Sequence, residues 1–173
     1  MEYKRVSEVI NVSSKDRDIT LFPSPSRYNI SFINTVGKSF KNIESIRLLS
    51  ATLPDINNIT QEPYLVLQIE EVENSGMYGS NSVLNNGSFL VQLDRVISTG
   101  YFLNTKTDIC KSIINTYSTP LRELSKMSIS ITDESGNLFN FGTDTVTPAK
   151  SRQHLLSFEI IRLEPVSKLT TLH

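Results

Sequence analysis

The sequence predicts an all-β protein, an antiparallel β-sandwich of the single jelly-roll kind with about eight strands and one short inserted helix. Two observations carry this prediction. Apolar residues recur mainly at every second position, which is the period of a strand, and clusters of turn-forming residues separate the alternating runs at short intervals. The 173 residues show no internal repeat and no linker, so residues 1–173 are expected to form one domain.

The expected strands follow in chain order from this alternation. Most of them carry apolar side chains on one face and polar side chains on the other, as in sheets that meet the core on one side and water on the other. The stretch from Asn42 to Pro54 has apolar residues at both parities, which indicates a central or doubly covered strand. The other expected strands are defined by Val6–Val12; Tyr28, Ile30 and Phe32; Leu65, Leu67 and Ile69; Phe89, Val91 and Leu93; Met127, Ile129 and Ile131; Leu138–Phe141; and Leu156, Phe158 and Ile160.

One hairpin is expected around the loop Asp133–Asn137. This loop contains Asp, Ser, Gly and Asn, the residues that favour tight turns, and alternating runs lie on both sides of it. We therefore expect Met127–Asp133 to pair with Leu138–Phe141.

One segment departs from the strand period. Ile109, Ile113 and Tyr117 recur at the spacing of a helix face, and Pro120 follows as a stop signal. Thr107 and Asp108 are placed to cap the segment. The pattern predicts a short helix from Asp108 to Tyr117, inserted between strands.

The charge balance gives no reason to expect an anionic partner. The chain has 17 basic and 18 acidic residues, a net charge of −1, and no block of like charges. No apolar run approaches the ~20 residues that cross a bilayer. We therefore expect contact neither with nucleic acid nor with a membrane.

Catalytic and metal-binding chemistry is poorly represented. The usual nucleophile, zinc, phosphate and dinucleotide motifs are absent, so no cofactor, no metal and no small-molecule substrate is expected. The single cysteine, Cys110, is interpreted as a small apolar residue and His154 as a hydrogen-bonded residue at the edge of the core. Asp16 with Asp18, and the loop Asp133–Asn137, offer oxygen ligands for calcium, but both are better explained as polar turns.

A cluster near the N-terminus has the composition of an interaction segment. Alternating charges precede an apolar stretch that contains proline, a pattern in which charged pairs set the register and an apolar anchor supplies affinity. A surface loop explains the same residues equally well. As an interface, its rim contacts would be Lys15, Asp16, Arg17 and Asp18, and its buried anchor Leu21, Phe22 and Pro23.

Several stretches of the sequence resemble single jelly-roll virion proteins of large DNA viruses, including minor capsid and penton-type proteins. Similar segments occur in structural proteins of tailed phages. These stretches cover 51 of the 173 residues and are Ile10–Asp18, Phe22–Pro25, Tyr28–Phe32, Ile43–Pro54, Pro63–Glu71 and Asp133–Asp144. The resemblance implies a jelly roll of the virion that has no active site and assembles with copies of itself or with other capsid proteins.

Three functions are carried forward from the sequence. The first is a virion structural protein, a penton or minor capsid component, for which Phe22→Ala is expected to weaken assembly and leave the fold intact. The second is a ligand- or carbohydrate-binding module of a viral spike or tail, with Tyr78 and Ile59 as its candidate contact residues. The third, an enzyme, requires that His154 meet a carboxylate in space.

Overall fold

The computed structural model describes residues 2–72, 78–93, 95–98, 101–104 and 114–166. Among these residues no helix is long and apolar enough to cross a membrane. The short helices are α1 (Phe32–Thr35) and α2 (Ser82–Asn86), with 3-10 turns η1 (Ser14–Asp16), η2 (Ile59–Gln61) and η4 (Lys150–Arg152). The strands are β1 (Tyr3–Ser13), β2 (Arg27–Ser31), β3 (Phe40–Pro54), β4 (Leu65–Ile69), β5 (Phe89–Val91), β6 (Arg95–Ser98), β7 (Tyr101–Asn104), β8 (Ile114–Leu124), β9 (Lys126–Thr132) and β10 (Leu155–Pro165).

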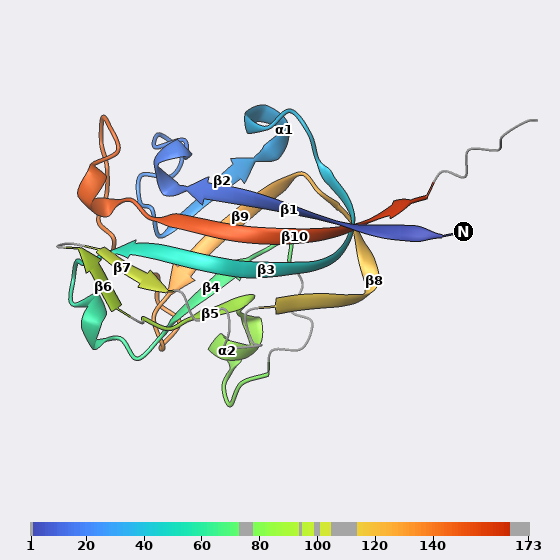
Figure 1. Ribbon diagram of the computed structural model, residues 1–173. Helices are drawn as coiled ribbons and strands as arrows, with labels where there is room; N and C mark the ends of the chain where they lie inside the picture. Colours follow the sequence, from blue (N-terminus) through green and yellow to red (C-terminus); the bar gives the residue numbers. More distant parts are fainter. Residues whose placement is uncertain (1, 73–77, 94, 99–100, 105–113, 167–173) are drawn as a thin grey trace, which may run out of the picture.

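The strands form two packed antiparallel sheets, which confirms the all-β sandwich (Figure 1). One sheet has the order β1-β10-β3-β7-β6, with β8 also paired to β3, and the other has the order β2-β9-β4-β5. Four strand pairs, β1–β10, β2–β9, β3–β8 and β4–β5, are nested, so that each pair lies in the sequence between the two strands of the pair before it. Successive pairs belong to alternate sheets. This arrangement is the jelly roll that the alternation predicts.

The core lies between the two sheets and is built mainly from residues that the strand period assigns to inner faces, with Phe40 and Ile59 added from outside the predicted strands. Phe89 of one sheet and Phe158 of the other place their ring centroids 5.8 Å apart across the sandwich. Strand β3 is central, with β10 on one side and β7 and β8 on the other. The largest fully buried side chains are Tyr28, Phe40, Phe89, Phe141, Phe158, Ile43, Ile46, Leu48, Leu53, Ile59, Leu65 and Leu67.

The prediction of a helix from Asp108 to Tyr117 is wrong for residues 114–117, the part of this segment that the structure describes. Residues 108–113, Cys110 among them, lie outside the described residues, but residues 114–117 begin β8. Here pairing with β3 overrides the helical spacing, because β3 offers an open edge on which Thr116 lies opposite Ser45. Pro120, expected to stop the helix, falls in the irregular part of β8, where the register to β3 shifts between Ile43 and Ser45.

The hairpin after β9 forms, but its second strand does not. The Asp133 carboxylate accepts the N–H groups of Ser135 and Asn137, both at 2.9 Å, and closes the turn. Only an isolated bridge, Thr132 to Leu138, continues the pairing, so Leu138–Phe141 is not a strand. The alternation there has another cause, since Phe139 and Phe141 are both buried in the core while the chain crosses the end of the sandwich.

Gly136 supplies the backbone conformation that this turn requires. Its φ is +87°, and a Cβ atom placed on it would lie 3.0 Å from Cγ2 of Val83 in α2. We expect Gly136→Ala to lower the free energy of unfolding by about 1–2 kcal/mol, because both the left-handed backbone and the contact become strained. Urea denaturation measures the change, with Ser135→Ala as the matched control at an exposed neighbour. Equal stabilities of Gly136→Ala and the control would contradict this explanation.

Candidate functional site

The segment between β1 and β2 is folded by local capping. The Ser13 side chain accepts the N–H of Lys15 at 3.3 Å and caps the 3-10 turn η1. The Asp18 carboxylate accepts the N–H of Thr20 at 2.9 Å, and the Phe22 N–H bonds to the Asp18 carbonyl at 2.8 Å. These bonds arrange the segment as two consecutive turns, between which Arg17 has an extended backbone.

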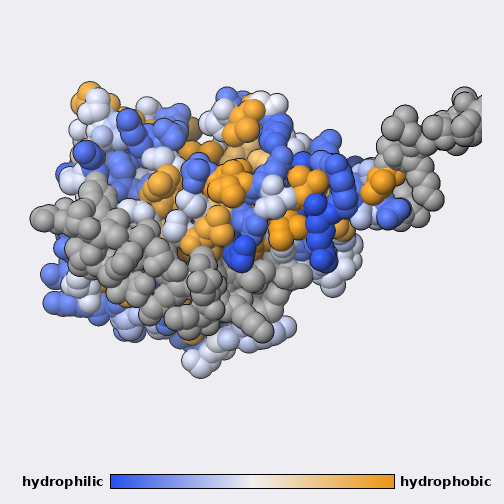
Figure 2. Space-filling view, in the orientation of Figure 1, coloured by the Kyte–Doolittle hydropathy of each residue, from blue (hydrophilic) through white to orange (hydrophobic). Residues whose placement is uncertain are grey.

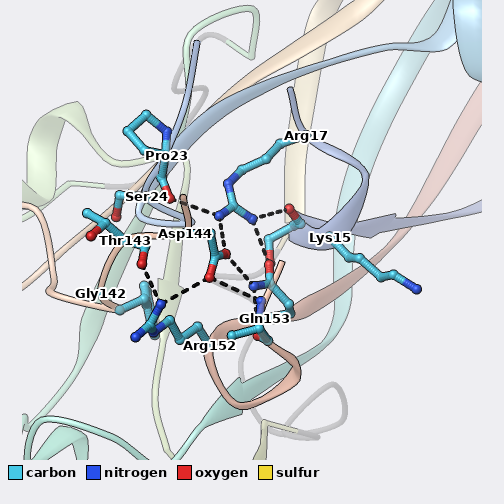
Figure 3. A network of polar contacts seen from close by, with 12 residues as sticks. Lys15, Arg17, Pro23, Ser24, Gly142, Thr143, Asp144, Arg152 and Gln153 are labelled. Carbon is cyan, nitrogen blue, oxygen red and sulfur yellow. Dashed lines mark hydrogen bonds and ion pairs between the residues drawn. The ribbon is translucent and has the colours of Figure 1, made fainter. Parts of the chain in front are cut away.

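The side chain of Arg17 points into the protein, and every N–H of its guanidinium group is bonded (Figure 3). Its Nε donates to the Phe22 carbonyl at 2.8 Å, and its Nη1 donates to the Ser14 carbonyl and to Gln153 Oε1 at 2.6 and 2.7 Å. Its Nη2 donates to the Pro23 carbonyl at 3.0 Å and to Asp144 Oδ2 at 2.6 Å. One arginine thus holds both ends of the segment.

Asp144 is the counter-ion, and its side chain and that of Arg17 are both fully buried. Its Oδ2 also accepts Gln153 Nε2 at 2.8 Å, and its Oδ1 accepts the Ala149 N–H at 3.0 Å and Arg152 Nη1 at 3.2 Å. Burial alone would raise the pKa of Asp144. The hydrogen bonds from Ala149, Arg17, Gln153 and Arg152 outweigh it and hold this pKa at about 2.

Gln153 and Ser14 extend the network to the start of β10. Gln153 Oε1 accepts the Ser14 hydroxyl at 3.0 Å, and the Ser14 hydroxyl accepts the His154 N–H at 2.9 Å. In Figure 3, Arg17 and Arg152 approach Asp144 from different sides, with Gln153 next to both. The N-terminal segment and the connection from β9 to β10 are therefore joined by one buried polar cluster.

His154 lies beside this cluster in the core. Its Nε2 is 3.0 Å from the Tyr28 hydroxyl, while its buried Nδ1 has no hydrogen-bond partner. Burial, with a smaller contribution from the positive charge of Arg17, lowers the pKa of His154 to about 3. Burial also raises the pKa of Tyr28. Within the described residues, no hydrogen bond joins His154 to a carboxylate.

The structure divides the residues of the predicted interface. Lys15, Asp16 and Asp18 are exposed, as are Pro23 and Leu21, the last with 70% of its surface accessible. The prediction of Arg17 as a rim contact is wrong, because its side chain is fully buried beside Asp144 and all its N–H donors are bonded within the protein. Phe22 is half-buried and packs against the core of the same chain. Its truncation is therefore expected to lower stability, and Leu21 replaces it as the exposed apolar residue of this segment.

We define the loop end as residues 14–26 together with 138–154. These two stretches lie at the same end of the sandwich (Figure 1), where the Asp144 N–H bonds to the Pro23 carbonyl at 2.8 Å. The loop end exposes 80% of Val146 and 50% of Leu138, in addition to Leu21. A hollow of about 450 Å³ adjoins it, lined in part by Lys15, Lys150 and Gln153.

The other candidate ligand residues do not converge. Among the described residues, no group of three or more His, Cys, Asp or Glu could hold a metal ion, and the carboxylates of Asp18 and Asp133 cap turns. Two residues were expected to contact a carbohydrate. For Ile59 this expectation is wrong, because the residue is fully buried. Tyr78 is 91% exposed.

Asp144, Gln153 and Ser14 are the members of the buried cluster that sequence reasoning missed. Asp144 lies 127 positions from Arg17, and no local spacing connects the two. No local signal separates Arg17 from its charged neighbours Asp16 and Asp18, and none identifies Asp144 as its counter-ion.

Comparison with known proteins adds no match to these observations. The sequence matches no protein-family model, and a search of curated proteins finds no significant match. The fold and the site define a single jelly roll whose loop end is held together by a buried ion pair and its hydrogen bonds.

Proposed function

We propose that this protein is a structural subunit of a virion, a penton or minor capsid component, that works by binding copies of itself and other capsid proteins. Jelly rolls serve many functions, so the proposal does not rest on the fold alone. The observation that carries it is the loop end, where exposed apolar side chains project from loops that a fully buried ion pair holds in place. The resemblance of Ile10–Asp18, Phe22–Pro25 and Tyr28–Phe32 to virion proteins agrees with it.

The buried cluster gives the loop end the properties of a binding surface. Loops that are ordered before binding lose little conformational entropy when a partner docks. Arg17 orders residues 14–23 through three carbonyl groups, and Asp144 orders the facing loop through Ala149 and Arg152. A role in packing against other capsid proteins uses this ordered surface and requires no catalytic residue.

The distribution of polar and apolar groups also suits an interface. Leu21 and Val146 are the most exposed apolar residues of the loop end. Lys15, Asp16 and Asp18 are exposed on the same segment as Leu21. Apolar anchors with charged residues nearby are the usual composition of interfaces between folded subunits, in which the charges act on specificity more than on affinity.

Leu21→Asp tests this surface. We expect the variant to fold with the stability of the wild-type protein, because 70% of Leu21 is accessible. When variant and wild-type chains are expressed together during particle formation, the share of the variant in purified particles is expected to fall about tenfold or more, as placing a charge in a buried contact costs a few kcal/mol. Quantitative mass spectrometry of the particles measures the ratio.

The matched control is Tyr78→Asp, which introduces the same charge at a 91% exposed residue near α2. It should enter particles as often as the wild-type chain. Equal incorporation of Leu21→Asp and the wild type would rule out the loop end as the packing surface.

A further inference from the structure

The hollow beside the loop end lies on the outer face of the larger sheet. Ser13 at the end of β1 pairs with Leu155 at the start of β10, and Leu155 pairs with Thr52 near the end of β3. The adjoining residues on the same strands are buried in the core: Val12, Ala51 and Leu156. Because successive side chains of a strand point to opposite faces, Ser13, Leu155 and Thr52 belong to the outer face. They form the floor of the hollow, and Figure 1 shows the three strand ends next to one another.

Two turns carry lysine residues at the edge of this floor. Lys15 lies in η1 and Lys150 in η4, and both residues line the hollow. Gln153 holds the two turns together, because its Oε1 accepts the Ser14 hydroxyl at 3.0 Å and its Nε2 donates to the Ala149 carbonyl at 2.9 Å. In Figure 3 the side chain of Lys15 points away from this buried cluster. The backbone that carries both lysines is therefore ordered before a ligand binds, which lowers the entropic cost of binding.

The hollow presents hydrogen-bond donors and no carboxylate. Among the described residues that line it, none is acidic. Asp16, the chain neighbour of Lys15, lines a separate groove, and Lys15 forms no ion pair with a described residue. The side-chain amide of Gln153 is bonded through both its atoms within the buried cluster. The lysine ammonium groups and the hydroxyl groups of Ser13 and Thr52 can all donate hydrogen bonds to a ligand.

Two positive charges in one hollow favour a doubly charged anion. At neutral pH a phosphate monoester carries a charge of about −1.5 to −2 and several strong acceptor oxygens, and lysine is a common ligand of phosphate. A carboxylate carries a single charge and leaves one of the two ammonium groups uncompensated. The local excess of positive charge does not appear in the net charge of the chain, which is −1, because Lys15 and Lys150 are distant in the sequence.

The rest of the ligand meets apolar groups. On this face of the sheet, apolar side chains lie among polar ones over β1, β10 and β3 (Figure 2). Leu155 is 41% exposed and lines the hollow together with Pro148. His154 is the one aromatic residue among the described residues that line it, and its ring packs in the core, with centroids 5.5 and 5.4 Å from those of Tyr28 and Phe141. A nucleobase therefore has no ring to stack on, whereas a short aliphatic group can contact Leu155 and Pro148.

We propose that the hollow binds a phosphate monoester with a short aliphatic group. Lys15 and Lys150 hold the phosphate from the two turns. The hydroxyl groups of Ser13 and Thr52 donate to its oxygens from the floor, and the aliphatic group lies against Leu155. The volume of about 450 Å³ falls within the range of sites for small ligands. This inference goes beyond the proposed function and does not depend on it.

Butyl phosphate is the probe for this site. In heteronuclear NMR of the isotope-labelled full chain, it should shift the amide signals of Ser13, Lys15 and Thr52 in a saturable manner, with a dissociation constant on the order of 1 mM or below. Pentanoate carries the same butyl group on a singly charged carboxylate and should bind about tenfold more weakly. Butylammonium has the opposite charge and should cause no saturable shift at these residues.

Two variants test the charge of the hollow. Lys15 is exposed, so Lys15→Gln should keep the fold and raise the dissociation constant for butyl phosphate about tenfold, because a charge-assisted hydrogen bond is lost. Thr52→Asp places a negative charge on the floor and should abolish saturable binding. The matched control is Lys41→Gln, at an exposed lysine near the opposite end of β3, which should bind like the wild type. Unchanged amide signals away from the hollow show that each variant is folded.

Four results would overturn the inference: no saturable shift with butyl phosphate, equal affinity for pentanoate, equal effects of Lys15→Gln and Lys41→Gln, or wild-type affinity in folded Thr52→Asp. Tighter binding of N-acetyl phosphoserine amide, which carries its phosphate on a peptide unit, would also contradict it and assign the hollow to a phosphorylated partner protein. These measurements use the isolated chain and no particles, so their failure is distinguishable from failure of the proposed function.

Discussion

Asp144→Asn is expected to lower the free energy of unfolding by about 3–5 kcal/mol, which is a large part of the stability of an ordinary domain. The substitution keeps the size of the side chain and removes its charge, so the guanidinium of Arg17 becomes a buried cation without a counter-ion. Three carbonyl groups stay bonded to Arg17, but they supply only partial charges. Urea denaturation at neutral pH measures the loss.

Asp16→Asn is the matched control for this substitution. Asp16 carries the same charge one residue from Arg17 but is exposed, and its substitution should change stability by less than about 0.5 kcal/mol. Adding Arg17→Met to Asp144→Asn should recover part of the loss, because the unpaired charge is then removed. If Asp144→Asn is as stable as the control, the ion pair does not hold the loop end together.

Acid is expected to destabilise the protein through His154, beginning below about pH 6.5. The pKa of His154 is 6.5 in its ordinary state and about 3 in the folded protein, where burial and Arg17 oppose its protonation. As the pH falls, the unfolded chain therefore takes up this proton first. The stabilising contribution is complete above pH 6.5, is lost progressively towards pH 3, and amounts to about 3 kcal/mol lost by pH 4.

Asp144 adds a separate loss at lower pH. Its pKa falls from an ordinary 3.8 to about 2 in the folded protein, so its stabilising contribution is present above pH 3.8 and is lost between pH 3.8 and 2. His154→Phe removes the first titration and leaves the second. Urea denaturation of both proteins at intervals from pH 7.5 to 5.5 should give a slope only for the wild type, because Glu8, Glu71 and Glu159, whose pKa values the fold lowers, titrate below that range. The same slope in His154→Phe would show that another group titrates there.

Most of the sandwich follows from the strand period alone. Met127, Ile129 and Ile131 are all buried, as their alternation predicts. The nested pairing could not be predicted in the same way, because the period of a strand does not identify its partner; the one pairing expected, between Met127–Asp133 and Leu138–Phe141, is reduced to the bridge from Thr132 to Leu138. The strand β8 does not follow, because its apolar spacing also fits a helix, and the choice is made by the open edge of β3.

The loop end could be predicted only in part. The exposed residues of its N-terminal segment are visible as a charged run next to Leu21. The burial of Arg17 is not, because it depends on Asp144 and Gln153, which lie more than 120 positions further along the chain, after nine of the ten described strands. A long-range ion pair leaves no local periodicity, whereas a strand repeats its signal every second residue.

The most direct test of the proposed function, a structural role in a virion, is made on particles purified from cells that express this gene. The measurement is the copy number of the protein per particle, by quantitative mass spectrometry against a labelled standard. We predict a fixed stoichiometry relative to the major particle proteins, maintained through repeated purification. A protein that is abundant in infected cells but lost from the particles during purification would contradict the account.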